Sequence, residues 1–328
     1  MVDTTSPSPI PGTPGAAKLR GPQKLLDFLF VGSTQFFALV VFLILGGVTI
    51  SLFSGSWLAV KTFGLPFLWS SNWNPVTGAF GAWVAIKGTI VTSIIAMVIA
   101  VPVSFGIAFF LTEVCPRFLR KPLAVAIELL AGIPSIIYGI WGLFVFAPFL
   151  QSTVQPFLIE TLGSLPAIGL LFKGPPLGIG VMTAGIILGI MITPFISSIM
   201  REVFTTVPPM LKESAYGLGC TMWEVVWRIV LPFTRVGVIG GVMLGLGRAM
   251  GETMAVTFVI GNSHRSAWSL FAPGQTISSN LANEFTEATD PLYTSSLIAL
   301  GLVLFFITFI VLAFAKMLLV QAQRKAGG

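Results

Sequence analysis

Residues 208–232, PPMLKESAYGLGCTMWEVVWRIVLP, are the stretch around which this chain is organised. The two leading prolines suit the first turn of a helix, because the N–H group that proline lacks would be unpaired there. Apolar residues then recur at helical spacing. Gly219 predicts the end of that helix, since the residue after a helix often takes a positive φ. Thr221 and Glu224 match a capping box, so a second short helix should run to Leu231, before the final proline. The stretch predicts a hairpin of two short helices.

The rest of the sequence has the composition of a membrane protein. Of its 328 residues, 55% are hydrophobic and 9% are charged, with a mean hydropathy of +0.94. These values predict an all-α polytopic membrane protein. Six apolar runs exceed the roughly 20 residues that a helix needs to cross a bilayer. The runs are 28–53, 88–112, 123–150, 177–200, 236–262 and 292–315. The charges inside them are Glu128, Arg248 and Glu252.

We expect five parts along the chain. Residues 1–24 are rich in Pro, Ser, Thr and Gly and predict a disordered cytoplasmic tail. A first transmembrane helix should take 25–54 and a periplasmic loop 55–86. A core of five further transmembrane helices, with the hairpin, should take 87–318, and a cytoplasmic tail 319–328. A cleaved signal peptide is not expected, because the first apolar run starts late and is too long.

Lysine and arginine predict the orientation of these helices. With both termini in the cytoplasm, thirteen basic residues lie inside and four lie outside, as the positive-inside rule requires. The inner residues are Lys18, Arg20, Lys24, Arg117, Arg120, Lys121, Arg201, Lys212, Arg228, Arg235, Lys316, Arg324 and Lys325. The outer residues are Lys61, Lys87, Lys173 and Arg265. This orientation places the hairpin in the cytoplasm.

The expected outer segments carry aromatic and acidic residues. The tryptophans there are predicted to anchor the chain at the membrane interface. They are Trp57, Trp69, Trp73, Trp83 and Trp268. The last outer loop gathers Glu284, Glu287 and Asp290. We interpret this acidic cluster first as a solvated face, with contacts to an external protein as the alternative.

Features of enzymes and of nucleotide binding are missing from the sequence. It contains no G-x4-G-K-[ST] phosphate loop, so this chain should not hydrolyse ATP. Its one histidine, His264, gives neither a metal cluster nor a catalytic triad. Cys115 and Cys220 fall in expected cytoplasmic segments and are interpreted as free thiols. The net charge of +6 indicates membrane topology before nucleic-acid binding. We therefore expect no catalytic residue, no cofactor, no metal and no nucleic-acid partner.

Pro102, Pro134 and Pro194 lie inside the second, third and fourth expected spans. Proline frees a backbone carbonyl and bends a membrane helix, either for packing or beside a pathway. Residues 132–135, Gly-Ile-Pro-Ser, are the most suggestive, because they can open the third span. Glu128 lies near the inner end of that span, where pairing with a basic residue or snorkelling to the cytosol is favoured over a substrate role.

The fifth span carries small residues and charges together. On a continuous helix, Gly237, Gly241, Gly245, Arg248, Glu252 and Ala255 fall within an arc of roughly 80°. Small residues at four-residue spacing let another helix approach closely.

Arg248 and Glu252 have two possible roles within that span. A charge within the bilayer is costly, so each should face the bundle interior or a wet cavity. Four residues apart, they can form a salt bridge that locks the helices. Alternatively, Arg248 meets an oxyanion, which its planar guanidinium binds through two oxygens. Glu252 would then partner Arg248 when the path is empty, or accept a hydrogen bond from a protonated substrate oxygen.

The hairpin also carries a family resemblance. Glu213-Ser214-Ala215, three residues, Gly219, nine residues, Ile229, one residue and Leu231-Pro232 resemble the EAA loop of ABC importer permeases, E-A-A-x3-G-x9-I-x-L-P. Only Ser214 departs from that pattern, one small residue for another. The resemblance implies a type I ABC importer permease fold, in which the loop is a coupling helix seated in a cleft of an ATPase subunit.

Two longer segments make the family resemblance more specific. Residues 128–139, ELLAGIPSIIYG, and residues 240–257, GGVMLGLGRAMGETMAVT, look like the PstC type of phosphate ABC permease, as does the hairpin. The similarity covers about 28–319. It implies that Arg248 and Glu252 take part in passing the phosphate ion across the lipid bilayer. It further implies a bacterial inner-membrane complex with a paralogous permease subunit (PstA type), two ATPase subunits (PstB type) and an external phosphate-binding protein (PstS type).

Two alternatives stay open at this point. A sulfate or molybdate importer would share the hairpin. An ion channel or carrier that needs no ATPase belongs to a different class and would leave the coupling motif without a purpose.

Overall fold

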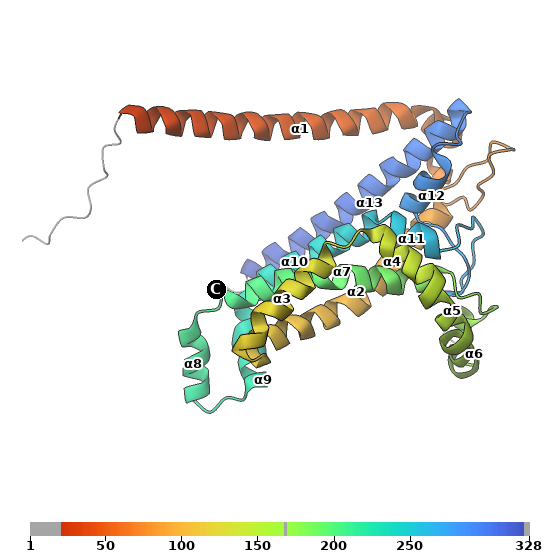
Figure 1. Ribbon diagram of the computed structural model, residues 1–328. Coiled ribbons are helices and arrows are strands. Elements are labelled where there is room, and N and C mark those ends of the chain that lie inside the picture. The colour runs from red at the N-terminus through yellow and green to blue at the C-terminus, as the bar shows by residue number, and fades with distance from the viewer. Residues whose placement is uncertain (1–20, 167–168, 325–328) are drawn as a thin grey trace, which may run out of the picture. The chain divides into compact units, whose positions relative to one another are not determined.

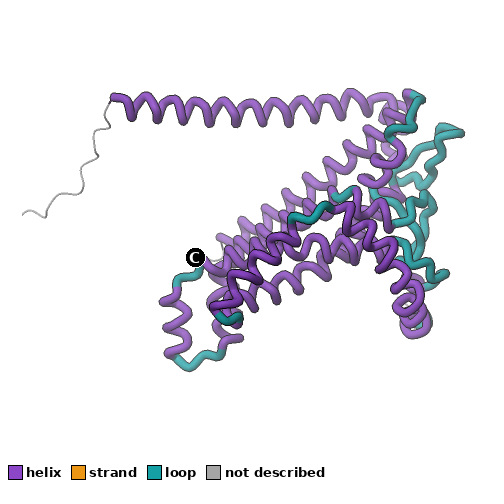
Figure 2. The backbone as a smooth tube through the Cα atoms, in the orientation of Figure 1, coloured by secondary structure: helices purple, strands orange, loops and turns teal. Residues whose placement is uncertain are grey.

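The computed structural model describes residues 21–166 and 169–324, and the described part is helical, with one isolated β-bridge between Asn74 and Ala79 (Figures 1 and 2). The chain divides into two compact units, residues 1–51 and 52–328, and each is described by itself. The first unit contains most of helix α1, whose apolar side chains from Phe28 to Ile50 are largely exposed, as suits a lipid-facing helix. The expected tail lies, as far as Arg20, outside the described residues, as do the last four residues of the chain.

The elements follow one another in this order: α1 Gly21–Phe63, η1 Leu65–Leu68, α2 Trp83–Phe109, η2 Phe110–Val114, α3 Arg117–Ala131, α4 Ser135–Trp141, η3 Gly142–Phe146, α5 Ala147–Phe149, η4 Leu150–Val154, α6 Gln155–Leu162, η5 Gly169–Phe172, α7 Val181–Thr205, α8 Pro209–Gly217, α9 Met222–Val225, η6 Val226–Val230, α10 Leu231–Gly251, α11 Met254–Val259, α12 Ile277–Glu284 and α13 Pro291–Arg324. η1 and η5 are 3₁₀-helical, and η2, η3, η4 and η6 are π-helical.

Six stretches of helix in the described part are long and apolar enough to cross a membrane, which confirms the expected number of spans. They are Leu26–Phe63, Trp83–Val114, Ser135–Leu162, Val181–Thr205, Met222–Gly251 and Pro291–Met317. α1 continues to Phe63, so residues 55–63 of the expected outer loop are helical.

The third span lies further along the chain than predicted. The sequence indicated a single helix over 123–150, but the helix breaks after Ala131 and resumes at Ser135. Pro134 lacks an N–H group and disfavours helical geometry in the residue before it. Tyr138 bridges the break, because its hydroxyl donates at 3.0 Å to the carbonyl of Leu130, which also accepts from the Ile133 N–H at 3.3 Å. The expected opening at residues 132–135 is therefore confirmed, whereas Pro102 and Pro194 lie inside continuous helices.

The four π-helical segments have a shared cause. Each ends two residues before a proline; the prolines are Pro116, Pro148, Pro156 and Pro232. In a regular α-helix, the ring of a proline collides with the carbonyl four residues earlier. A π turn at that place widens the helix and relieves the collision, so the helix continues through Pro148, Pro156 and Pro232. After η2 the helix instead ends at Cys115, whose ψ is 129°, and α3 starts after Pro116.

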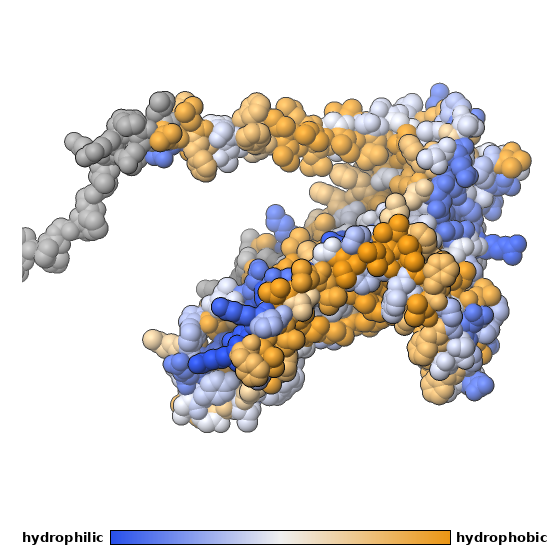
Figure 3. All heavy atoms as spheres, in the orientation of Figure 1, coloured by the Kyte–Doolittle hydropathy of each residue, from blue (hydrophilic) through white to orange (hydrophobic). Residues whose placement is uncertain are grey.

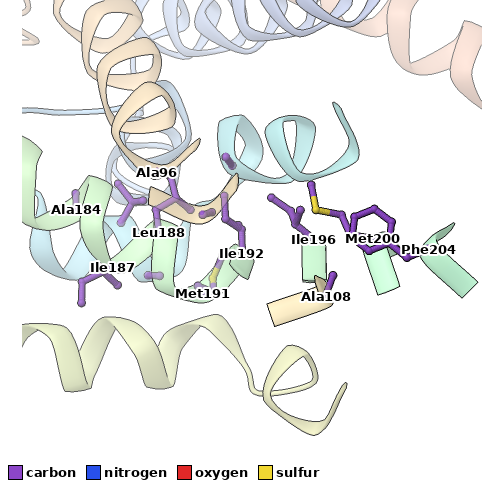
Figure 4. Close-up of a cluster of buried hydrophobic side chains, with 14 of the residues drawn as sticks. Ala96, Ala108, Ala184, Ile187, Leu188, Met191, Ile192, Ile196, Met200 and Phe204 are labelled. Atoms are coloured by element: carbon purple, nitrogen blue, oxygen red, sulfur yellow. The ribbon is translucent and has the colours of Figure 1, made fainter. Parts of the chain in front are cut away.

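Helix α7 is the centre of the second unit. Over its most apolar window 72% of its residues are buried, against at most 28% for the other spans. Its buried side chains point towards small residues of α2, such as Ala96 (Figure 4). The predicted close approach of α10 is also confirmed, because a Cβ on Gly245 would lie 2.5 Å from Ile196 of α7.

The second unit has two polar ends and an apolar middle (Figure 3). One end carries α8, α9 and the start of α3, and the other carries most of the loops (Figures 1 and 2). We call these the hairpin end and the loop end. The side chains between them on the visible face are mainly hydrophobic, as expected for a bundle that spans a bilayer.

Candidate functional site

The hairpin end is built as the sequence predicted up to residue 224. Helix α8 begins after Pro208 and ends in a Schellman motif at Gly219, whose φ is +85°. The Gly219 N–H donates to the carbonyl of Tyr216 at 3.0 Å, and the Cys220 N–H donates to that of Ala215 at 3.1 Å. This motif turns the chain sharply and fixes the angle at which α8 leaves the bundle.

The second arm of the hairpin differs from the prediction. The capping box of Thr221 and Glu224 is present. However, the helix does not stop at Leu231. It passes through the π segment η6 into α10, so that Met222–Gly251 forms one continuous span. Pro232 is tolerated because it falls in the first turn of α10, directly after the widened turn. Only α8 is therefore a separate short helix.

The residues of the EAA-like motif divide into an exposed and a packed set. Glu213, Ser214, Gly219 and Pro232 are exposed, whereas Ala215 is buried and Ile229 and Leu231 are half-buried. Around the exposed set lie large apolar side chains without cover, such as Met210 (75% exposed) and Leu218 (86% exposed). Solvent-exposed apolar side chains grouped on an otherwise polar hairpin are typical of a surface that contacts another protein.

Arg248 lies in the last turn of α10, and its side chain is exposed. A cation is favourable there because the C-terminal end of a helix carries partial negative charge. Its guanidinium carbon lies 5.5 Å from the centre of the Phe195 ring of α7, a cation–π contact. In the described part of the chain, Arg248 forms no ion pair.

Glu252 does not share a helical face with Arg248, contrary to the expected stripe. Helix α10 ends at Gly251, and Glu252 is extended, with φ −68° and ψ 128°. Its carboxylate oxygen Oε1 instead accepts from the backbone N–H of Ala255 at 3.3 Å, at the start of α11. The predicted stripe fails because a helix break interrupts it, and the salt bridge that would lock the helices is not formed.

The structure brings two of the distinctive sequence segments together. Gly139 of α4 lies against α11, where a Cβ would be 3.0 Å from the Cα of Ala255. Residues 132–139 therefore pack beside the break at residues 252–253. The two interrupted spans meet where Gly139 packs on Ala255, seven residues after Arg248 in the sequence. Interrupted membrane helices commonly form binding sites in transporters.

Glu128 pairs with a basic residue, as the sequence indicated. Its carboxylate lies 2.5 Å from the Arg201 guanidinium of α7. This ion pair joins α3 to α7 at the hairpin end, so Glu128 has a structural partner.

The acidic cluster at the loop end is not uniformly solvated. Glu287 and Asp290 are exposed, but the Glu284 carboxylate is only 13% exposed. It accepts hydrogen bonds from Trp73 Nε1 (2.6 Å), the Tyr293 hydroxyl (2.6 Å) and His264 Nε2 (2.7 Å). The interpretation of Glu284 as a solvated residue is wrong, because these donors replace water. Trp73 is accordingly buried, at 8% exposed, rather than an interface anchor.

These bonds make the loop end sensitive to acid. Burial raises the pKa of Glu284, but the bonds from His264, Tyr293 and Trp73 together outweigh burial and hold the pKa below its ordinary value. A lowered carboxyl pKa contributes stability that is present above the unfolded pKa, about 4.3 for glutamate, and is lost as the pH falls through the folded pKa. We expect the melting temperature to decrease as the pH drops below about 4.3. Glu284→Gln should have a lower melting temperature than the wild type at neutral pH, and its melting temperature should depend less on acid pH. Thermal unfolding of the detergent-solubilised protein against pH measures both effects. The exposed Glu287→Gln is the control, and an unchanged acid profile in Glu284→Gln would contradict this prediction.

Other contacts at these sites carried no sequence signal. Phe195 beneath Arg248 and Glu113 beside Lys212 depend on which helices meet, and residue spacing does not encode that.

The fold and the two sites define a class: a helical membrane protein with six candidate spans, an exposed helical hairpin at one end and an arginine in its fifth span that forms no ion pair among the described residues. A family model described as "Binding-protein-dependent transport system inner membrane component" matches residues 100–322, and the chain belongs to this family. It is therefore an inner membrane component of a transport system and not an enzyme.

Individual relatives within this family give a more specific similarity. The chain is 62% identical over 303 residues to the "Phosphate transport system permease protein PstC" of Mesorhizobium japonicum, covering 92% of this chain and 93% of that protein. It is 56% identical over 303 residues to the protein of the same name from Pasteurella multocida, covering 92% and 94%. The resemblance to PstC-type permeases is thus confirmed.

Solved structures support the fold alone. A bacterial ABC transporter that imports the acidic polysaccharide alginate matches with a TM-score of 0.57 at 16% identity, covering 92% of this chain and 96% of that chain. An inward-facing MetNI methionine ABC transporter matches with a TM-score of 0.52 at 15% identity, covering 75% and 95%. The fold is that of type I ABC importer permeases.

Proposed function

We propose that this chain is a permease subunit of an ATP-driven importer of inorganic phosphate and forms half of its translocation path. The observation that carries the proposal is Arg248, which is exposed within the fifth span and has no carboxylate partner in the described part of the chain. A guanidinium stays charged at any relevant pH and binds two oxygens of a tetrahedral oxyanion at once. The similarity to PstC proteins supports phosphate as that oxyanion.

Glu252 is proposed to contribute selectivity. At neutral pH, hydrogen phosphate carries a protonated oxygen that can donate to a carboxylate, whereas sulfate carries none. Glu252 lies beyond the helix break, is half-buried and forms no ion pair within the described residues. Its bond to the Ala255 N–H uses Oε1 and leaves Oε2 available.

The proposed assembly contains four kinds of subunit. Beside this chain stand a paralogous permease of the PstA type, two ATPases of the PstB type and an external phosphate-binding protein of the PstS type. The ATPase seat is proposed to consist of Glu213, Ser214, Ala215, Gly219, Ile229, Leu231 and Pro232. Exposure of Met210 and Leu218 beside this motif supports a protein contact at that place.

We propose that the hairpin end faces the cytoplasm, with both termini on that side. Basic residues gather there, including Arg117, Arg120 and Arg201, as the positive-inside rule predicts. The order of an N-terminal tail, a first helix, an outer loop, a permease core and a C-terminal tail remains part of the proposal, with the first helix over Gly21–Phe63 and the last over Pro291–Arg324 in place of the expected bounds.

The mechanism is alternating access driven by the partner ATPases. Closure of the ATPases on ATP pushes α8 and tilts the bundle, opening the path outward to receive phosphate. Arg248, with a counterpart in the paralogous permease, replaces part of the hydration that the ion loses. Release of the ion requires that this binding stay weak.

Reconstitution in proteoliposomes tests the proposal. The complete complex, with ATP inside and the binding protein outside, should accumulate labelled phosphate, and excess sulfate or molybdate should not compete. Competition by either anion would assign the chain to another oxyanion. Phosphate uptake by the chain alone would assign it to an ATPase-independent channel or carrier.

A further inference from the structure

Helix α8 is fastened to the bundle by an ion pair that the EAA-like motif does not include. Lys212 Nζ lies 2.6 Å from Glu113 Oε1, and the two side chains are only 18% and 9% exposed. Within the described part of the chain, this is the one ion pair that joins α8 to another element.

Lys212 and Glu113 lie in different parts of the molecule, one on the hairpin and the other at the end of a membrane span. Lys212 precedes Glu213, the first residue of the proposed ATPase seat. Glu113 lies in η2, the π segment that ends the second span. That span packs along the central helix α7, where Ser104 also donates to the Thr193 carbonyl at 2.9 Å. A force applied at α8 therefore has a short route, through one pair of charges, to the central packing of the bundle.

The other arm of the hairpin is held in a different way. Trp223 and Trp227 contact Phe109 and Phe105 of α2, with ring centres 6.5 and 6.1 Å apart. These aromatic contacts hold α9 and η6 on α2, but they do not involve α8. Besides Ala215, which is buried in the hydrophobic core, α8 is attached to the end of the second span by the Lys212–Glu113 ion pair.

We propose that the Lys212–Glu113 ion pair is the link through which movement of α8 reaches the second span, so that both are positioning residues for energy coupling. This inference rests on the proposed function of the chain as an ATP-driven permease. Because the pair is shielded from water, its Coulomb attraction is stronger than that of an exposed pair, and removal of one partner leaves the other charge uncompensated.

Among the described residues, Glu113 forms an ion pair with Lys212 alone. The other ionisable groups of α8 are Glu213, which is an acid, and Tyr216, whose pKa is raised by burial and by the charge of Glu113. Tyr216 thus stays a neutral phenol and cannot balance the carboxylate. In a Lys212 variant, α8 loses its charged attachment without a replacement.

The test measures phosphate transported per ATP hydrolysed by the whole importer in proteoliposomes. For Lys212→Met and for Glu113→Gln, we expect this ratio to fall about tenfold, within the range by which single residues change coupling between distant sites. ATP hydrolysis and the amount of assembled complex should persist. The double variant Lys212→Met/Glu113→Gln should be no worse than either single variant, because one shared link is lost only once. Lys212→Arg, which keeps the charge, should retain most of the ratio.

The control is Lys121→Met, which removes an exposed lysine at the same end of the molecule. It should leave the ratio unchanged. Wild-type ratios in the single variants, or multiplied losses in the double variant, would overturn the link. Loss of the assembled complex would also overturn it, by assigning the pair to folding. Failure of the wild-type complex to transport phosphate would instead refute the proposed function, so the two failures are distinguishable.

Discussion

Arg248→Gln is expected to lower phosphate uptake by about thirtyfold or more while the complex still assembles. Loss of one partner from a desolvated charged contact costs roughly 2–5 kcal/mol, and every 1.4 kcal/mol is a factor of ten. Glutamine keeps hydrogen-bond donors but loses the charge that offsets dehydration of the anion. Uptake of labelled phosphate into proteoliposomes, beside co-purification of the partner subunits, measures both parts. Phosphate uptake by Arg248→Lys should lie between that of the wild type and that of Arg248→Gln, because an ammonium keeps the charge but cannot bind two oxygens in the planar geometry of a guanidinium.

The structure makes the two roles of Arg248 separable. A structural salt bridge with Glu252 would predict loss of assembly in Arg248→Gln, but the two side chains are not paired, and Arg248 contacts only the face of Phe195 among the described aromatic rings. Arg117→Gln, which removes an exposed guanidinium at the hairpin end, is the matched control and should transport normally. Failed assembly of Arg248→Gln, or uptake equal to that of Arg117→Gln, would count against anion contact.

The turn of the hairpin at Gly219 was predictable from the sequence because it depends on interactions between residues that are close in the chain. Gly219 was expected at positive φ because a Schellman motif needs that conformation, and Thr221 and Glu224 form their capping box within four residues. These motifs depend on neighbours in sequence alone. The number of spans was predictable for a similar reason, since the length of an apolar run decides whether it can cross a bilayer.

The position of breaks within spans was harder to predict. Hydropathy does not distinguish a continuous helix from two helices in line, so the break at Gly251–Glu252 was missed and the helix through Pro232 was ended too early. Pro232 follows a π segment and continues the helix, whereas Pro134 follows the turn after α3 and interrupts it.

Contacts between residues far apart in the sequence could not be predicted, for a different reason. Glu284 is separated from Trp73 by 211 residues and Glu113 from Lys212 by 99. The residue types alone permit many partners, and only the packing of the helices selects one. The acidic cluster was interpreted as solvated because burial of Glu284 requires donors from three separate segments of the chain, which composition cannot reveal.

Gly219→Pro is expected to reduce coupled transport to background while ATP hydrolysis and membrane insertion persist. Proline fixes φ near −65°, whereas Gly219 needs +85°, and proline also removes the N–H that donates to Tyr216. The left-handed conformation is thus lost outright, and α8 can no longer leave the bundle at the angle that seats it on an ATPase. Phosphate uptake and ATP hydrolysis, measured together in proteoliposomes, give the result.

A graded series at the same elbow separates backbone geometry from loss of a glycine. Gly219→Asn should retain most transport, because asparagine tolerates the left-handed region, and Gly219→Ala should be intermediate, at a cost of about 1–2 kcal/mol. Gly217→Ala is the control: Gly217 is helical, and a Cβ there meets no atom within 4 Å, so transport should be unchanged. If Gly219→Pro still coupled hydrolysis to uptake, the angle set by the Schellman motif would have no part in energy transfer. An order Asn, Ala, Pro of falling transport would tie that transfer to the conformation of one residue.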